Sequence, residues 1–179
     1  MTRMKELYQK TVIKEIAKEL GLSNVHQIPK ITKVVVNAGI GRASLDTKKL
    51  EPVLKGLAEI TGQAPVVTKA KKSIAGFKLR EGMSVGATVT LRGDMMYEFL
   101  DRLVSVALPR VRDFRGLKRD AFDGHGNYSL GIREHGVFPE IPFEEASEPF
   151  GLQVNISTTA RNDEEARALL THLGFPFKG

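Results

Sequence analysis

The chain has 179 residues and a formal net charge of +6 at pH 7, from 27 lysine and arginine residues against 21 aspartate and glutamate residues. This length suits one domain, which can bury a core without covalent cross-links. The absence of cysteine excludes disulfides, zinc ribbons and cysteine enzymes, and the positive charge favours a polyanionic partner. Residues 1–6 form no apolar run, so we expect no secretory signal, no membrane partner and a soluble, cytoplasmic protein.

In the first half of the chain, the spacing of apolar residues predicts two helices and one strand. An amphipathic helix is expected over residues 4–20, ended by a glycine. The β-branched stretch 31–37 predicts a strand that runs into a glycine turn at residues 39–41. Apolar side chains recur at helical spacing over residues 50–60 and predict a second helix.

The middle of the chain predicts a strand followed by a third helix. Residues 84–92 alternate apolar and polar side chains, which indicates a strand with one buried face. Asp94 is the expected N-cap of the helix. We expect the helix to end at Pro109, because proline cannot donate a backbone hydrogen bond and crowds the preceding turn.

The last third predicts two strands and a C-terminal helix. Residues 128–133 and 152–157 both alternate, and a segment rich in proline and acids separates them. Asn162 begins a capping-box pattern, and the helix that it starts should end at Gly174. The sequence therefore predicts a single α+β domain over residues 1–179, with a mostly antiparallel sheet, helices packed on one face and projecting basic loops.

The face of this sheet opposite the helices should be polar and almost free of carboxylates. Its predicted residues are Lys33, Asn37, Thr88, Thr90, Arg92, Ser129, Arg133, Gln153, Asn155 and Ser157. Amide, hydroxyl and guanidinium groups suit phosphate, base edges and the ribose 2′-hydroxyl. The face carries no stacking aromatics, so folded RNA fits better than a single strand. A solvated sheet face without a partner is the alternative.

Two segments concentrate positive charge and glycine and are expected to be loops. The first contains Lys69, Lys71, Lys72, Ser73, Lys78 and Arg80. The second contains Arg110, Arg112, Arg115, Lys118 and Arg119. Charged segments are usually solvated surface, but apolar residues 74–77 lie inside the first one, which favours an ordered, projecting element that contacts a polyanion.

An enzyme is the alternative from another class, because residues 39–44 approximate the glycine turn of a dinucleotide-binding site. Ser44 replaces the third glycine of that motif, and the candidate ribose-binding acids, Glu51 and Glu59, fall inside a predicted helix. A tight turn explains these glycines. We therefore expect no cofactor and no small-molecule substrate.

No other residue pattern predicts catalysis or a metal site. The histidines at positions 26, 125, 135 and 172 lack metal-binding spacing. Four glutamates, Glu140, Glu144, Glu145 and Glu148, lie in a proline-broken segment without fixed spacing. They favour an acidic patch that faces a basic protein over a pair of catalytic carboxylates.

Several blocks together resemble the family of bacterial large-subunit ribosomal protein five, which binds 5S rRNA. These blocks are residues 33–41, 60–65, 68–74, 77–82, 107–117, 122–128 and 138–141. Similarity continues to the C-terminal residues 164–167 and 173–177, so the resemblance spans essentially the whole chain.

This resemblance implies a non-enzymatic protein that attaches 5S rRNA to the central protuberance of the large subunit. It implies further contacts with 23S rRNA, peptidyl-site tRNA, other 5S-binding ribosomal proteins and small-subunit ribosomal protein thirteen. The family's 5S rRNA surface uses positions that match Asn37, Gln63 and Thr90, and we add Lys33, Thr88 and Arg92.

The resemblance also gives a role to the charged segments. Residues 69–82 match the element of the family that faces tRNA. Residues 110–117 and 134–145 match the side that faces the small subunit. The intersubunit residues are expected to be Arg110, Arg112, Arg115, Glu140, Glu144 and Glu145.

Overall fold

A computed structural model describes residues 2–40, 50–142 and 149–178. The chain divides into two compact units. The first contains Met1–Val34, Arg92–Leu130 and Asn155–Gly179, and the second contains Val35–Leu91 and Gly131–Val154. The expectation of a single domain stays a prediction.

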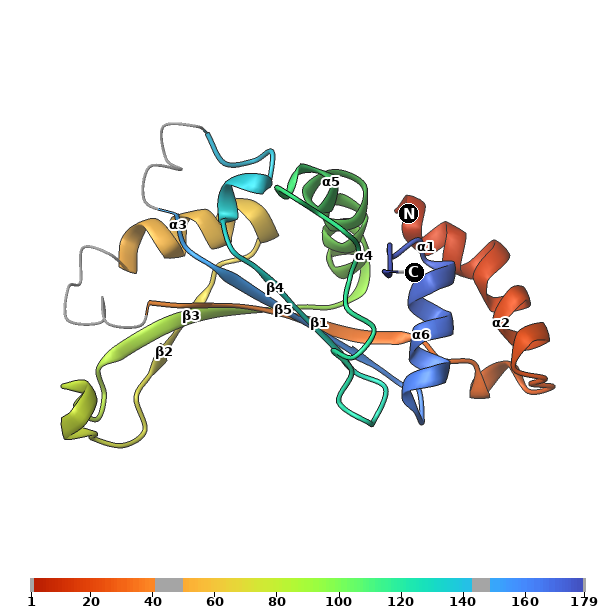
Figure 1. The fold of residues 1–179 in the computed structure, drawn as a ribbon, viewed down its shortest axis with the longest axis horizontal. Helices are drawn as coiled ribbons and strands as arrows, with labels where there is room; N and C mark the ends of the chain where they lie inside the picture. Colours follow the sequence, from red (N-terminus) through yellow and green to blue (C-terminus); the bar gives the residue numbers. More distant parts are fainter. Residues whose placement is uncertain (1, 41–49, 143–148, 179) are drawn as a thin grey trace. The chain divides into compact units, whose positions relative to one another are not determined.

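Five strands form one sheet in the order β2-β3-β1-β5-β4 (Figure 1). They are β1 (Ile31–Gly39), β2 (Val66–Lys69), β3 (Ser84–Leu91), β4 (Tyr128–Ile132) and β5 (Leu152–Thr158). Every strand except β2 was predicted by alternation or by β-branched composition. Together with the helices, the sheet confirms the predicted α+β class.

The helices of the first unit come from its three chain segments. They are α1 (Arg3–Leu7), α2 (Ile13–Glu19), α4 (Gly93–Arg102), α5 (Leu108–Arg110) and α6 (Asp163–His172). Helix α1 packs against α4, and α2 packs against α6. The predicted N-terminal helix is confirmed in extent, although a π-helical segment, Tyr8–Val12, separates α1 from α2.

The predicted N-cap of the third helix is wrong. Arg92, not Asp94, is the N-cap residue, and Asp94 lies in the first turn, where its carboxylate pairs with Lys5. The helical run ends at Arg110, one residue after Pro109, in agreement with the predicted end. A π-helical segment, Leu103–Ala107, precedes that proline.

The cap of the C-terminal helix α6 agrees with the prediction. The Asn162 side chain accepts a hydrogen bond from the Glu165 N–H at 2.9 Å. The Glu165 carboxylate in turn accepts from the Arg161 N–H at 2.9 Å. The first bond satisfies a backbone donor that the first turn of the helix leaves unpaired, and the second ties the residue before the N-cap to that turn.

The second unit contains α3 (Leu50–Thr61), which packs on β3 and buries the apolar side that the sequence predicted. Strands β2 and β3 pair antiparallel, with Val66 opposite Thr88. Figure 1 shows that they form a long hairpin with a short helical turn at its tip. Of the helices among the described residues, none has the length and apolar character needed to cross a membrane.

Candidate RNA interface

Alternating burial along the strands separates an apolar face from a polar one, as predicted. The core side includes Val34, Val36, Ala38, Ala87, Val89, Leu91, Leu130, Ile132, Val154 and Ile156, each at most 6% exposed. On the other side, Thr90, Ser129, Arg133 and Gln153 are exposed, and Lys33, Asn37, Thr88, Asn155 and Ser157 are half-buried.

In the second unit, β1 and β3 bring three of the predicted 5S rRNA residues onto neighbouring strands. The Thr88 hydroxyl donates to the Val36 carbonyl oxygen at 3.3 Å, which fixes that side chain against β1 next to Asn37. Thr90 lies two positions further along the same face of β3 and is exposed. Half-buried Asn37 and exposed Thr90 therefore lie on the polar side of adjacent strands.

Gln63 approaches this part of the sheet from the end of α3. The Thr61 hydroxyl donates to the Leu57 carbonyl oxygen at 2.6 Å and accepts from the Gln63 N–H at 3.4 Å, so the backbone at Gln63 is tied to the helix end. Its side chain is exposed. Because Val66 pairs with Thr88 in antiparallel register, the chain enters β2 from the Thr90 end of β3.

The remaining two predicted 5S rRNA residues belong to the first unit. Lys33 is half-buried on β1, and Arg92 is exposed immediately before α4. The nearby strands in this unit are already hydrogen-bonded to each other through side chains. The Ser129 hydroxyl donates to Asn155 Oδ1 at 2.8 Å, and the Thr32 hydroxyl donates to the Ser157 carbonyl oxygen at 3.0 Å.

The predicted basic loop is the end of the β2–β3 hairpin and has an ordered backbone. The Ala70 N–H donates to the Met83 carbonyl oxygen at 2.8 Å, and the Gly82 N–H donates to the Ala70 carbonyl oxygen at 2.9 Å. Closer to the tip, Ile74 and Leu79 exchange backbone hydrogen bonds of 2.9 and 3.1 Å. The expectation of an ordered, projecting element is confirmed.

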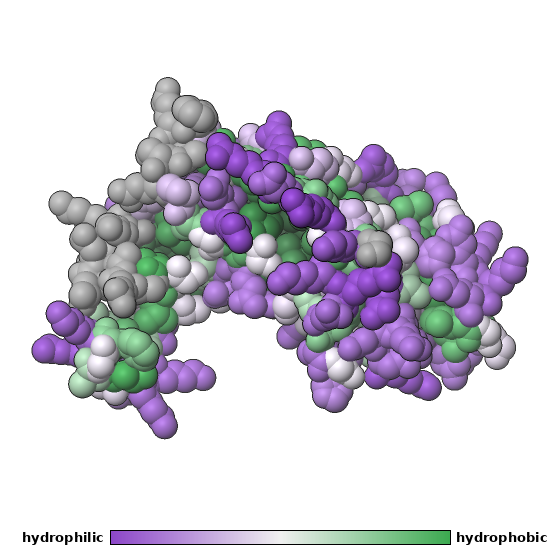
Figure 2. All heavy atoms as spheres, in the orientation of Figure 1, coloured by the Kyte–Doolittle hydropathy of each residue, from purple (hydrophilic) through white to green (hydrophobic). Residues whose placement is uncertain are grey.

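The basic hairpin, residues 69–82, presents all of its predicted cations to solvent. Lys69, Lys71, Lys72, Lys78 and Arg80 are exposed, and none forms an ion pair with a described residue. The Ser73 hydroxyl is used within the hairpin, where it accepts from the Glu81 N–H at 2.9 Å. Figure 2 shows apolar surface at the tip with hydrophilic side chains around it.

The apolar side chains at this tip are the feature that sequence reasoning did not resolve. Phe77 is 79% exposed and Ile74 is 45% exposed. The sequence placed them inside a basic segment and so favoured an ordered element, but it did not show whether they pack inward. In the sequence, the feature that could have indicated an exposed apolar tip is Phe77, the one aromatic residue among the cations of this segment.

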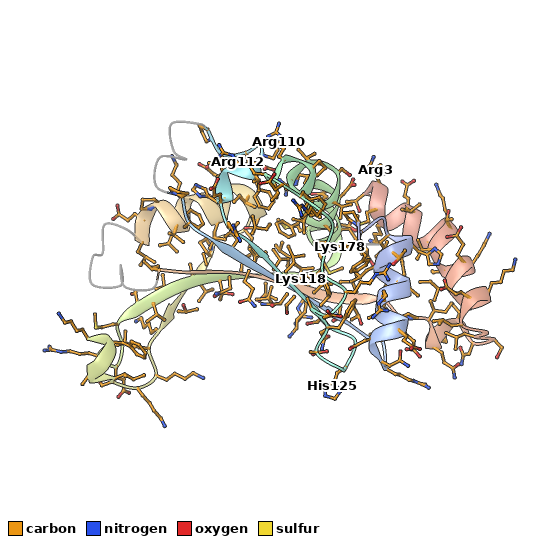
Figure 3. All side chains as sticks on the ribbon, in the orientation of Figure 1. Arg3, Arg110, Arg112, Lys118, His125 and Lys178 are labelled. Carbon is orange, nitrogen blue, oxygen red and sulfur yellow. The ribbon has the colours of Figure 1, made fainter. Side chains whose placement is uncertain are left out.

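The second basic segment lies in the first unit and begins at Arg110, the last residue of α5. Arg110, Arg112 and Arg115 are exposed, and Figure 3 shows Arg110 and Arg112 at the end of that helix. The chain then returns to the core at Leu117, whose N–H donates to the Pro176 carbonyl oxygen at 2.7 Å. This bond anchors the basic segment to the C-terminal residues.

The acidic partners predicted for the intersubunit side are only partly described. Glu140 is half-buried in the second unit, and Glu144 and Glu145 lie outside the described residues. The segment that holds Glu140 begins at His135, whose N–H donates to the Phe150 carbonyl oxygen at 3.1 Å. The Phe150 N–H donates to His135 Nδ1 at 3.2 Å, and the two rings stack with centroids 3.9 Å apart.

Of the glycine turn at residues 39–44, on which the alternative of a nucleotide-dependent enzyme depends, the structure describes only Gly39 and Ile40. Gly39 ends β1, and the Ile40 N–H donates to the Val85 carbonyl oxygen at 3.0 Å. Gly41 to Ser44 lie outside the described residues. Glu51 and Glu59 lie within α3, as predicted, so neither is at the end of a second strand.

Comparison with known proteins matches nearly the whole chain to one family. Residues 24–80 match the family described as ribosomal protein L5, and residues 84–177 match the description of that ribosomal family's C-terminus. Relatives named large ribosomal subunit protein uL5 include those of Synechocystis sp. and Geobacter sulfurreducens. The first is 57% identical over 98% of both chains, and the second is 56% identical over 99% of both. The chain therefore belongs to the ribosomal protein L5 family.

Proposed function

We propose that this protein is a non-enzymatic constituent of the large ribosomal subunit that binds 5S rRNA and holds it in the central protuberance. Membership of the ribosomal protein L5 family supports the coarse role, because these relatives are named as proteins of the large subunit. The observation that carries the finer role is the carboxylate-free polar face of β1 and β3 in the second unit.

The proposed 5S rRNA surface consists of uncharged hydrogen-bonding groups on a fixed sheet. Asn37, Gln63 and Thr90 present amides and a hydroxyl, and Thr88 helps to hold β3 against β1. Such groups can pair with base edges, ribose hydroxyls and phosphates of a folded RNA. Lys33 and Arg92 belong to the first unit, and we propose them as separate cationic contacts with 5S rRNA.

The basic hairpin is proposed to contact peptidyl-site tRNA. Its cations are exposed on an ordered backbone, so they can reach phosphates without a large ordering cost. The proposed partners also include 23S rRNA and other 5S-binding ribosomal proteins, and we assign no residues to these contacts.

The intersubunit contact with small-subunit ribosomal protein thirteen is assigned to two charged segments. One carries Arg110, Arg112 and Arg115, which follow the start of α5. The other carries Glu140 together with Glu144 and Glu145, which lie outside the described residues. Ion pairs at the rim of an interface are weak and reversible, which suits a contact between subunits that move.

The competing function is a nucleotide-dependent enzyme that uses the turn at residues 39–44. Purification of the full chain from cells separates the two proposals through the material that copurifies. A stable association with 5S rRNA is expected. A bound dinucleotide, with no affinity for 5S rRNA, would overturn the proposed function.

A further inference from the structure

Two large apolar side chains at the tip of the basic hairpin have no core to pack into. Phe77 is 79% exposed, and Ile74, three residues earlier, is 45% exposed. Scattered exposed apolar residues are common and need no partner. These two differ because they lie together on one ordered turn, whereas most large apolar side chains of the described residues are buried.

The backbone at the tip holds Phe77 outward. A 3₁₀ turn, Ala75–Phe77, is closed by the Lys78 N–H, which donates to the Ala75 carbonyl oxygen at 3.0 Å. Lys78 itself adopts a left-handed conformation with φ 53°. Because the bridge between Ile74 and Leu79 closes the base of this turn, the ring is presented to a partner without first ordering the loop.

The charge around the ring selects the class of partner. Lys71, Lys72, Lys78 and Arg80 are exposed in the same hairpin, and Glu81 is its one carboxylate. This surplus of cations disfavours a second copy of the hairpin and favours a polyanion. Among polyanions, RNA also offers flat apolar faces, on which aromatic side chains stack.

We propose that the tip binds RNA by stacking Phe77 on an exposed nucleobase, with Ile74 packed beside the same base and the surrounding cations on the flanking phosphates. Every base has a π-face, so this contact would recognise an accessible base at a turn of a folded RNA without reading its identity. The inference rests on the proposed tRNA contact of the basic hairpin and assigns it a base-stacking component.

The test uses assembled ribosomes that carry single variants and measures the affinity of peptidyl-site tRNA at several salt concentrations. Phe77→Ala should weaken binding by about 5- to 100-fold, because one base loses its stacking partner. The log–log salt slope should stay unchanged, since every phosphate contact remains in place. Phe77→Tyr should restore most of the affinity, and Phe77→Leu should not, because leucine keeps apolar area without a π-face.

Val66→Ala is the matched control, because Val66 is 66% exposed on β2 of the same hairpin but away from the tip. It should bind tRNA as the wild type does. If Phe77→Leu binds as well as the wild type, stacking is wrong. If Phe77→Ala has no effect while removal of the hairpin cations does, the tRNA contact stands and the base-stacking component falls.

If neither change affects tRNA, the proposed tRNA contact itself fails. A membrane is the other surface that could take up an apolar tip among cations, so the isolated chain is also mixed with vesicles of phosphatidylcholine and phosphatidylserine. Vesicle binding that depends on Phe77, together with tRNA binding that does not, would overturn the inference.

Discussion

Gly86 allows β1 and β3 to approach closely next to Thr88 of the proposed 5S rRNA surface. A Cβ atom at this position would lie 2.4 Å from the Ala38 carbonyl oxygen, so Gly86→Ala must move one strand. Overpacking of this kind typically costs about 1–3 kcal/mol. We expect urea denaturation to show that loss for Gly86→Ala. Gly131→Ala should be tolerated, because nothing lies within 4 Å of its added Cβ. Equal stability of both variants would contradict the proposed role of Gly86.

The sequence could predict which strand residues are buried but not the need for this glycine. The alternation of apolar and polar side chains along residues 84–91 can be seen from the sequence of this one segment. The burial of Ala87, Val89 and Leu91 confirms the predicted buried face. The constraint at Gly86 comes from Ala38 on a neighbouring strand. The spacing of residues within one strand does not show which strands pair, so it could not predict this constraint. The predicted cap at Asp94 was wrong for a similar reason, because Lys5 on another helix holds its carboxylate.

Among the described residues of the second unit, His135 is a buried titratable residue that should make stability depend on pH. Burial lowers the pKa of His135 below its ordinary value of 6.5. The unfolded chain therefore takes up a proton near that pH, whereas the folded chain does not, so stability should fall as the pH drops from 7 to 5. Protonation would also replace the acceptor that the Phe150 N–H uses.

His135→Phe isolates this effect, because it keeps a ring against Phe150 and removes the titration. The variant should lose about 1–3 kcal/mol at pH 7, since the Phe150 N–H loses its acceptor. Between pH 7 and 5 its stability should fall less than that of the wild type. Parallel stability curves for the two proteins, measured by urea denaturation at each pH, would rule out His135 as a source of the pH dependence.

At the scale of elements, the basic hairpin should be separable from the sheet face. Alanine at Lys71, Lys72, Lys78 and Arg80 should weaken tRNA binding on the ribosome and flatten its salt dependence, by about one unit of log–log slope for each phosphate that is no longer neutralised. Affinity of the isolated chain for 5S rRNA should hardly change. Circular dichroism serves as the folding control. Loss of 5S rRNA affinity with unchanged tRNA binding would show that the two surfaces are assigned the wrong way round.

Long periodic elements were predictable, and short or interrupted ones were not. Helix α3 and strand β3 each extend over several repeats of their pattern, and their predicted extents agree with the structure. Strand β2 is only Val66–Lys69, with no buried residue among its four, so no alternation could mark it. The π-helical segment Leu103–Ala107, which interrupts the helix before Pro109, is indicated by no spacing of apolar residues.

At the scale of the whole molecule, RNA attachment and subunit association should depend on different segments. Reversing the charge of Glu140, Glu144 and Glu145 should weaken association of the two ribosomal subunits, with each broken ion pair contributing about 1 kcal/mol or less. Affinity for 5S rRNA should stay unchanged. Light scattering follows subunit joining, and filter binding follows 5S rRNA. Normal joining with reduced 5S rRNA affinity would place the acidic segment on the RNA side of the protein.

The most direct test of the central claim is the affinity of the full chain for isolated 5S rRNA, measured by filter binding for Asn37→Ala and Thr90→Ala. Each change leaves an RNA group unpaired in a desolvated interface, so each should cost about 1–3 kcal/mol of binding free energy. Thr171→Ala changes an exposed threonine on α6 and should bind as the wild type does. Wild-type affinity in both sheet-face variants, with folding intact, would contradict the claim that this face holds 5S rRNA.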